Sequence, residues 1–302
     1  MTRFARLAPN AQGILLAIGA IFFFTLMDAT AKGLTARYDT LQVVWARYTG
    51  QTVIVLALLA PRLRAVARTR YPGMQFLRSC FQFGATLCFF LSLAHIGLAE
   101  ATAVMDLNPV LITLGAAIFL GERIGLRRAL GIGAALAGSM LIIRPGTDVF
   151  SVYALLPLCA AAFYAAYAIS TRAVGRDESV WTSLLYTALV GTALTSVALP
   201  AVWVTPAAGD AAFFLLLGVL GGAAQLLLIR ALSVAEAGVV APFGYVGLLF
   251  AAIWGMAFFG EYPDRWTIMG ALVIVAAGLY VWHRETRAVA SARPGPGKDD
   301  AA

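Results

Sequence analysis

The segment ATAVMDLNPVLITLGAAIFL, residues 101–120, carries the polar groups best suited to chemistry in this chain. Asp106 supplies a carboxylate and Asn108 an amide, and Pro109 interrupts helical hydrogen bonding beside them. An aspartate at the centre of a membrane-embedded helix costs about 2.5–3.5 kcal/mol, so its side chain should face the interior of a bundle or a wet cavity. We therefore treat Asp106 as a candidate site residue and Pro109 as a structural one that frees a carbonyl one turn earlier for a ligand or an ion.

Helical periodicity decides which of these groups share a face. At 100° per residue one stripe is formed by Thr102, Asp106, Pro109 and Thr113. Asn108 lies about 200° round from Asp106, so the two side chains cannot line the same slot. One of the two should face the cavity while the other bonds a neighbouring helix. We favour Asp106, with Thr102, as the cavity lining and keep Asn108 as a further candidate for substrate binding. An Asp106 satisfied inside the bundle by hydroxyl groups or an arginine is the alternative.

The first apolar run carries a second embedded carboxylate. Thr25, Asp28 and Lys32 share a face, and Asp28 with Lys32 forms an acid-then-base pair spaced i, i+4. Two interpretations stay open: mutual neutralisation near the outer interface, and a gating or substrate-binding role for Asp28.

Amides and aromatic rings in other apolar runs are further candidates for substrate contact. Arg78 lies near a helix end and is expected to snorkel to the interface, whereas Gln82, one turn further on, is deeper. Aromatic rings and amides that converge on a cavity would suit a flat, amphipathic organic molecule, although each ring alone is more typical of packing or lipid contact. The candidates in the second half of the chain are Tyr164, Tyr167, Gln225, Tyr245 and Trp254.

Two glutamates invite an assignment to proton transfer. Glu122 and Glu261 lie at helix ends beside arginines, where a solvated carboxylate has little free-energy cost. We therefore predict a structural role in turns for both. If protons are coupled to the function, the embedded Asp106 or Asp28 is the better candidate, because proton relays use carboxylates inside the membrane.

The composition indicates the environment that these groups require. The chain has 302 residues, of which 61% are hydrophobic and only 12% charged, about half the charged share of a soluble domain. The net charge of +7 comes from arginines clustered between apolar runs, a distribution typical of membrane topology and not of nucleic-acid binding. The three cysteines form no disulfide framework, no Cys/His spacing resembles a metal site, and we expect no cofactor.

Apolar runs long enough to cross a bilayer recur along the chain. We predict an all-α integral membrane protein with ten transmembrane helices and polar ends at 1–11 and 286–302, the latter a disordered cytoplasmic tail. With the N-terminus in the cytoplasm, 17 of the 22 Lys and Arg residues fall on the cytoplasmic side, so both termini should be cytoplasmic. The five expected outside or at the outer helix ends are Lys32, Arg37, Arg47, Arg144 and Arg265. A cleaved signal peptide is disfavoured because Asp28 and Lys32 flank the small-residue stretch. The predicted spans are 12–33, 41–60, 74–95, 100–120, 127–143, 151–171, 181–203, 211–232, 238–259 and 266–283.

The chain also contains an internal repeat. Glu122 and Glu261 are 139 positions apart, and in both copies an apolar helix ends in Gly-Glu before a short polar turn and a Gly/Ala-rich helix. We predict two repeats, 12–146 and 151–285, of five helices each. An odd number of helices forces the second copy to enter the membrane from the opposite side, an arrangement that lets a central site open to either side in turn.

On these features the chain resembles the EamA family of the drug/metabolite transporter superfamily. The resemblance rests on the two five-helix repeats and on FLGER and FFGEY, which close the fourth helix of each. It implies a bacterial inner-membrane carrier for a small organic metabolite. QVVWARY and APFGYVGLLFAAIWGMAFFGE look most similar to the branch that takes up riboflavin and S-adenosylmethionine. Uptake of a vitamin-like nutrient such as riboflavin is therefore our first expectation; S-adenosylmethionine uptake and export of amino acids or toxic organic compounds are alternatives.

Other classes of function find less support in the sequence. We expect no enzyme, because metalloprotease, paired-carboxylate and nucleotide-binding motifs are missing from it, and a channel would need charged rings or filter-like repeats. Without a nucleotide site, transport would draw on an ion or substrate gradient. Proton coupling and a homodimer both stay open.

Overall fold

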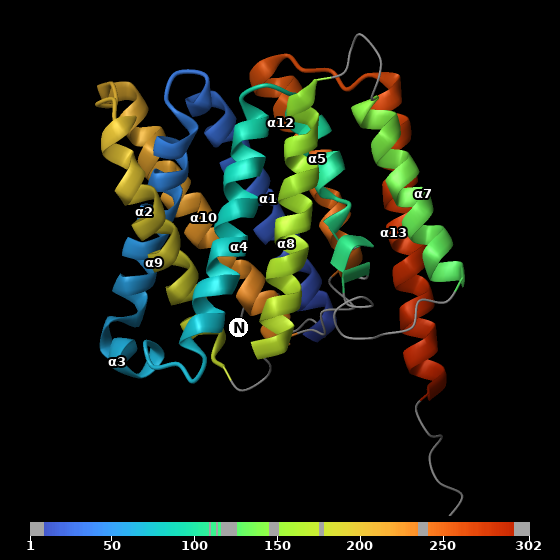
Figure 1. Ribbon diagram of the computed structural model, residues 1–302, viewed down its shortest axis with the longest axis horizontal. Helices are drawn as coiled ribbons and strands as arrows, with labels where there is room; N and C mark the ends of the chain where they lie inside the picture. The colour runs from blue at the N-terminus through green and yellow to red at the C-terminus, as the bar shows by residue number, and fades with distance from the viewer. Residues whose placement is uncertain are drawn as a thin grey trace, which may run out of the picture.

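The computed structural model describes residues 9–108, 110–112, 114–115, 126–144, 151–174, 178–234 and 241–292. Its long elements run antiparallel along one common direction (Figure 1). The first half contains α1 (Pro9–Thr35), α2 (Thr40–Leu59), the short α3 (Leu63–Val66), α4 (Pro72–Leu93), α5 (Leu98–Met105) and α7 (Leu126–Ile143). The second contains α8 (Leu155–Val174), α9 (Val180–Ala198), α10 (Ala208–Val234), the 3-10 helix η6 (Ala241–Tyr245), α12 (Val246–Phe259) and α13 (Arg265–Ala292). We call the two ends of the bundle the Lys32 end, at the top of Figure 1, and the α3 end, at the bottom.

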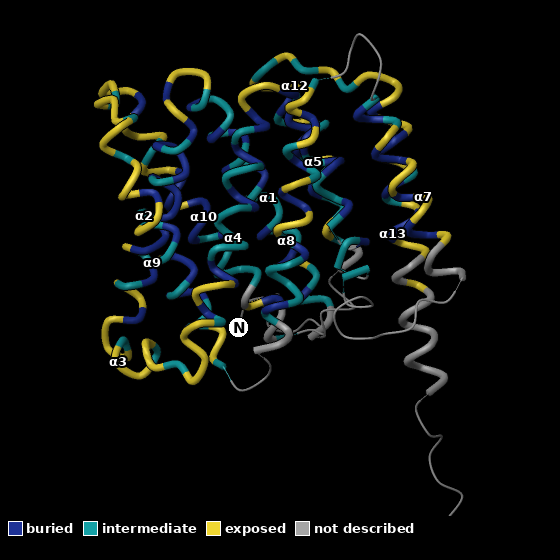
Figure 2. The backbone as a smooth tube through the Cα atoms, in the orientation of Figure 1, coloured by how far each residue is buried: buried dark blue, intermediate teal, exposed yellow. Residues whose placement is uncertain are grey.

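The bundle has the surface of a membrane protein. Six of the described helices are long and apolar enough to cross a bilayer, and they fall at six of the expected spans. Large apolar side chains point outward from the bundle, among them Val197 at 84% exposed and Leu215 at 75%. The exposed stretches follow the outer sides of the helices, while buried residues are most frequent on α2 and α4 (Figure 2). An outward apolar surface on this scale is stable only in lipid.

Close helix contacts are made where both partners are small. A Cβ added to Gly50 on α2 would lie 2.5 Å from the Gly218 Cα on α10, so the two backbones touch. Gly138 and Gly270 bring α7 and α13 together in the same way, since a Cβ on Gly138 would lie 2.9 Å from the Gly270 carbonyl oxygen. Small residues permit such approach in membranes, where dispersion contacts replace the hydrophobic effect between helices.

The helix contacts of the two halves correspond. If α1, α2, α4, α5 and α7 are matched in order with α8, α9, α10, α12 and α13, the packing of α1 on α10 has its counterpart in α8 on α4. The packing of α2 on α10 corresponds to α9 on α4, and that of α1 on α12 to α8 on α5. The remaining principal contacts, α2 with α9, α5 with α12 and α7 with α13, join each helix to its own counterpart.

The fourth and ninth spans are not the continuous helices that we expected. Helix α5 ends at Met105, and Asp106 and Leu107 form a turn before helical structure resumes at residue 108. Pro109 supplies a reason: it has no N–H to complete the helical hydrogen bond to the Met105 carbonyl. In the ninth span, η6 precedes α12. The stripe beyond Asp106 stays a prediction, because Pro109 and Thr113, like Glu122, lie outside the described residues.

At the α3 end a single carboxylate ties the two halves together. Glu178, just before α9, accepts hydrogen bonds from the Arg70 backbone N–H (2.7 Å), the Thr69 hydroxyl (2.8 Å) and the Gln75 amide (3.2 Å). Burial alone would raise the pKa of Glu178, but these three hydrogen bonds outweigh it and lower the pKa below its usual value.

Candidate functional site

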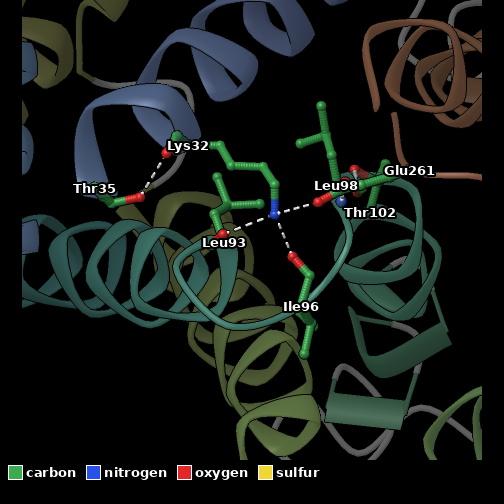
Figure 3. Close-up of polar contacts among 7 residues, drawn as sticks. All are labelled: Lys32, Thr35, Leu93, Ile96, Leu98, Thr102 and Glu261. Carbon is green, nitrogen blue, oxygen red and sulfur yellow. Dashed lines mark hydrogen bonds and ion pairs between the residues drawn. The ribbon is translucent and has the colours of Figure 1, made fainter. Parts of the chain in front are cut away.

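Lys32 connects three parts of the bundle at the end that bears its name (Figure 3). Its Nζ lies 2.8 Å from Oε1 of Glu261 and donates to the carbonyl oxygens of Leu93 (2.9 Å) and Ile96 (2.6 Å) at the end of α4. Carbonyls at a helix C-terminus carry partial negative charge, so they add to the attraction of the carboxylate. The interpretation that Asp28 neutralises Lys32 is wrong, because the Lys32 ammonium group binds Glu261 and two carbonyls from other parts of the chain. The i, i+4 rule describes only pairs within one helix.

Glu261 connects this contact to two further elements. Its Oε2 accepts from the backbone N–H of Leu98 at 2.9 Å, which satisfies a free donor at the N-terminus of α5. Its own N–H donates to the Gly255 carbonyl (3.0 Å), and Gly260 before it adopts the left-handed conformation (φ 65°) that ends α12. We use the name Lys32 latch for the Lys32–Glu261 ion pair together with its bonds to the Leu93 and Ile96 carbonyls and the Leu98 N–H. It joins α1, α4, α5 and α12.

A cavity of about 240 Å³ lies beside the Lys32 latch, and its lining includes Glu100, Glu261 and Asp264. Asp264 pairs with Arg144 at 2.8 Å, which ties the end of α7 to the connection between α12 and α13. Burial alone would raise the pKa of Asp264, but hydrogen bonds from Thr267 and the Arg144 guanidinium lower it. Among the described residues no group of three or more His, Cys, Asp or Glu side chains could hold a metal ion.

Below the Lys32 latch, four polar side chains from four helices occupy one level. Asp28 on α1, Arg47 on α2 and Thr86 on α4 each lie seven residues from the helix end nearest the latch, and Asp106 follows α5 at a similar depth. At 1.5 Å per residue this is about 10–12 Å into the bundle. We call Asp28, Arg47, Thr86 and Asp106 the polar layer.

Arg47 is the member of the polar layer that sequence reasoning missed. We had counted it with the arginines of the outer helix ends, but its side chain is only 9% exposed. Its Nη1 donates to the Thr86 hydroxyl, and its guanidinium lies 5.3 Å from the Tyr48 ring centre and 5.6 Å from that of Phe90. Its Nε is buried without a hydrogen-bond partner. The available signal was its place seven residues inside an apolar run, deeper than a snorkelling arginine needs to be.

The two carboxylates of the polar layer are also incompletely satisfied. Within the part of the chain that the structure describes, Asp28 makes no hydrogen bond or ion pair, although Arg47 is near enough to act on its charge. The Asp106 Oδ2 is buried without a partner. Asp106 lies within electrostatic range of Tyr245 on η6, so the breaks in the fourth and ninth spans adjoin one another. Buried polar groups without partners are rare in proteins, and such groups mark places where water or a ligand binds.

Asn108 does not bond a neighbouring helix as predicted. Its side-chain amide donates to the Met105 carbonyl of its own segment at 3.0 Å. That carbonyl is the acceptor which Pro109 leaves without a backbone donor. Thr102 likewise donates within α5, to the Leu98 carbonyl (2.8 Å).

Some of the aromatic and amide candidates contact other side chains, and others have no hydrogen-bond partner among the described residues. Trp254 donates from Nε1 to the Thr25 hydroxyl (3.1 Å), and Tyr164 lies beside Tyr167 with ring centres 5.8 Å apart. By contrast, the Gln82 Oε1 is buried without a partner, and Gln225 makes no hydrogen bond to any residue that the structure describes. All of these side chains are half-buried in the bundle.

Arg78 does not snorkel to the interface. It is 2% exposed, and its guanidinium donates to the Thr171 hydroxyl (3.0 Å), the Tyr167 hydroxyl (2.9 Å), the Gln75 amide oxygen (2.8 Å) and the Ser183 carbonyl (3.1 Å). The guanidinium also lies 4.9 Å from the Tyr167 ring centre. Arg78 therefore holds α4, α8 and α9 together and takes Tyr167 into that structural network.

Comparisons with known proteins agree with this architecture. Residues 11–144 and 151–282 each match the EamA-like transporter family. The pseudopaline exporter CntI of Pseudomonas aeruginosa strain UCBPP-PA14 is 32% identical over 88% of this chain and 94% of that protein. A riboflavin transporter of Rhizobium johnstonii is 30% identical over 87% of this chain and 88% of its own length. An S-adenosylmethionine uptake transporter of Rickettsia bellii is 26% identical, with 87% and 90% covered.

A solved crystal structure of a protein superposes with a TM-score of 0.64 and covers 92% of this chain and 99% of its own, at 19% identity. That likeness shows a shared fold. The matches to both halves and the relatives over nearly the whole length confirm the family that the sequence resembles. The chain therefore belongs to the EamA-like transporter family, as a multi-pass membrane transporter of small metabolites and not an enzyme.

Proposed function

We propose that the protein is a secondary carrier whose two halves are inverted repeats that expose a central site to each side of the membrane in turn. Two observations support this arrangement. Consecutive long helices alternate in direction, so five helices per half reverse the sense of the second half, and the helix contacts of one half correspond to those of the other (Figure 1). Rocking of one repeat against the other is the movement that such an arrangement permits.

The distribution of charge supports an orientation for the bundle. The α3 end carries Arg62, Arg64, Arg68 and Arg70 in one short stretch and further arginines toward the ends of α7, α8, α10 and α13, whereas the Lys32 end carries Lys32, Arg37, Arg144 and Arg265. By the positive-inside rule, the α3 end faces the cytoplasm and the Lys32 end faces outward. This orientation places residues 9 and 292, the first and last that the structure describes, on the cytoplasmic side of what we propose is the inner membrane of a bacterium.

The Lys32 latch is the observation that carries the proposal. It joins four helices directly above the polar layer, so in this conformation the outer end is closed by an ion pair and three backbone hydrogen bonds. Bonds of this kind can be broken and remade without disturbing an apolar core. Opening toward the outside requires Lys32 to leave Glu261 and the end of α4.

The polar layer supports a cargo with polar groups. Tyr164 and Trp254 supply aromatic surface near it, and the similarity to a riboflavin transporter keeps a vitamin-like nutrient as our first candidate for uptake. The pseudopaline exporter and the S-adenosylmethionine uptake transporter support export and a different cargo respectively. Asp28 and Asp106, both without hydrogen-bonded side chains among the described residues, are the candidates for proton coupling.

Counterflow in proteoliposomes tests the proposal. Vesicles that contain the purified protein and are loaded with unlabelled compound should accumulate labelled compound transiently, at a rate that saturates. The panel contains riboflavin, S-adenosylmethionine and amino acids, and empty vesicles are the control. Flux that neither saturates nor shows counterflow would identify a channel and contradict the proposal.

A further inference from the structure

We propose that Asp28 and Arg47 form a two-point site for a zwitterionic substrate, in which Arg47 holds a carboxylate and Asp28 an ammonium group. The inference rests on the proposed carrier function and assigns the substrate class of its central site. It starts from two opposite charges that lie at one depth and do not neutralise each other.

Arg47 is prepared for an anion. Its side chain is 9% exposed, one terminal nitrogen is fixed by Thr86, and two aromatic rings flank the guanidinium. The hydroxyl of Tyr48 lies 2.9 Å from the Thr86 hydroxyl and helps to fix that residue in turn. The Nε remains without a partner. A guanidinium held along one side presents donors in the flat fork that matches a carboxylate.

Asp28 supplies the opposite charge. Lys32, one turn away on the same helix, is occupied by Glu261 and by two carbonyls, so it does not neutralise Asp28. Arg47 acts on the charge of Asp28, but the two side chains form no ion pair within 4.0 Å. A carboxylate in this position accepts an ammonium group, which can donate up to three hydrogen bonds.

The absence of a direct Asp28–Arg47 contact is the informative feature. In a medium of low dielectric constant, opposite charges at one depth gain strongly by closing on each other. Here the guanidinium is directed to Thr86 on α4 while Asp28 stays on α1, which leaves room for a molecule that brings both charges. A zwitterion would neutralise both residues at once, whereas an uncharged cargo such as riboflavin would leave both without a counter-charge.

The test is ligand-induced stabilisation of the purified, full-length protein, followed as the shift in Tm. The common amino acids and S-adenosylmethionine are the zwitterions. Each active compound is compared with the amine that lacks its carboxylate and with the acid that lacks its ammonium group, and riboflavin is the uncharged comparison. We expect a zwitterion to bind at least about 30-fold more tightly than either analogue, the lower range for losing one member of a buried charge pair.

Variants assign the two points separately. In Arg47→Gln, the zwitterion should bind no more tightly than the amine that lacks its carboxylate. In Asp28→Asn, it should bind no more tightly than the acid that lacks its ammonium group. Arg47→Lys keeps the positive charge but loses the two parallel donors of the guanidinium, so it should retain part of the tighter binding of the zwitterion. Arg64→Gln, exposed at the α3 end, and Arg37→Gln, exposed at the Lys32 end, are the control variants and should bind as the unaltered protein does.

The Tm of each variant without ligand separates misfolding from lost recognition. The inference is overturned if no zwitterion stabilises the protein, or if Arg47→Gln and Asp28→Asn fold and discriminate as the unaltered protein does. Riboflavin binding that survives both substitutions, together with saturable riboflavin counterflow, would overturn this site while leaving the carrier function intact.

Discussion

Glu261→Gln tests how strongly the Lys32 latch holds the outer end closed. The substitution removes the negative charge and leaves one acceptor oxygen, which can serve either Lys32 or the Leu98 N–H, while the NH2 group takes the place of the other carboxylate oxygen. The side chains of Lys32 and Glu261 are 11% and 31% exposed and their charged atoms are 2.8 Å apart, so the pair is partly shielded from water. A hydrogen bond to a charged group contributes about 1.5–3 kcal/mol net, and a neutral one about 1 kcal/mol. The closed state should therefore lose at least about 1–2 kcal/mol relative to the open one.

A loss of this size shifts the population of the outward-open state by about 5- to 30-fold, since about 1.4 kcal/mol corresponds to a factor of ten. The shift can be measured as the rate at which a membrane-impermeant maleimide, added from outside, modifies a cysteine below the latch. Thr102→Cys is a suitable reporter, in a background in which Cys80, Cys88 and Cys159 are replaced by serine. We expect labelling about tenfold faster in Glu261→Gln.

Arg37→Gln provides the matched control. Arg37 pairs with Asp210 at 2.7 Å at the same end of the bundle, but it is 56% exposed and lies outside the latch. Exposed ion pairs contribute little, so this variant should label at the unaltered rate. Equal labelling of Glu261→Gln and the unaltered protein would refute the reasoning that the ion pair holds the outer end closed.

Three other predictions concern stability and are checked by thermal or chemical unfolding. Because the pKa of Glu178 is lowered on folding, its contribution is present above about pH 4.3 and is lost as the pH falls through the folded value. Glu178→Gln should therefore reduce Tm at pH 7 and flatten the decline in acid; an unchanged acid profile would be the contrary result. Arg78→Met should cost about 3 kcal/mol because it strips partners from Gln75, Tyr167 and a backbone carbonyl, and a neutral effect would show that water replaces them. Gly50→Val should cost at least about 1–3 kcal/mol because its side chain would enter the backbone of α10, whereas Gly73→Val, where a Cβ meets nothing within 4 Å, should not cause that clash.

Much of the fold could be predicted because lipid imposes simple rules on sequence. Spans such as α1 and α10 appear as apolar runs of sufficient length, and the paired Gly-Glu motifs mark the repeat. The breaks in the fourth and ninth spans were less accessible. Pro109 signalled a kink, but the capture of its freed carbonyl by Asn108 depends on a local choice of side-chain rotamer.

The candidate site was only partly predictable, because its contacts join distant parts of the chain. Asp28 and Asp106 could be identified from the cost of embedding a carboxylate. Lys32 pairs with Glu261 and not with Asp28 because of how α1 packs against the end of α12. Periodicity within one helix cannot predict contacts between helices. Arg47 was misplaced for the same reason: a count of arginines by loop does not reveal that its guanidinium turns inward to Thr86.

The most direct measurement of the central claim is transport by a protein whose latch is tied shut. Lys32→Cys and Glu261→Cys, joined by a short, reducible bis-thiosulfonate linker in the background without native cysteines, would hold α1 against the end of α12. The account predicts that cross-linked protein loses counterflow of any compound that the uncross-linked variant carries, and that reduction restores it. Undiminished counterflow by fully cross-linked protein would show that the outer end need not open at the Lys32 latch, and would contradict alternating access through it.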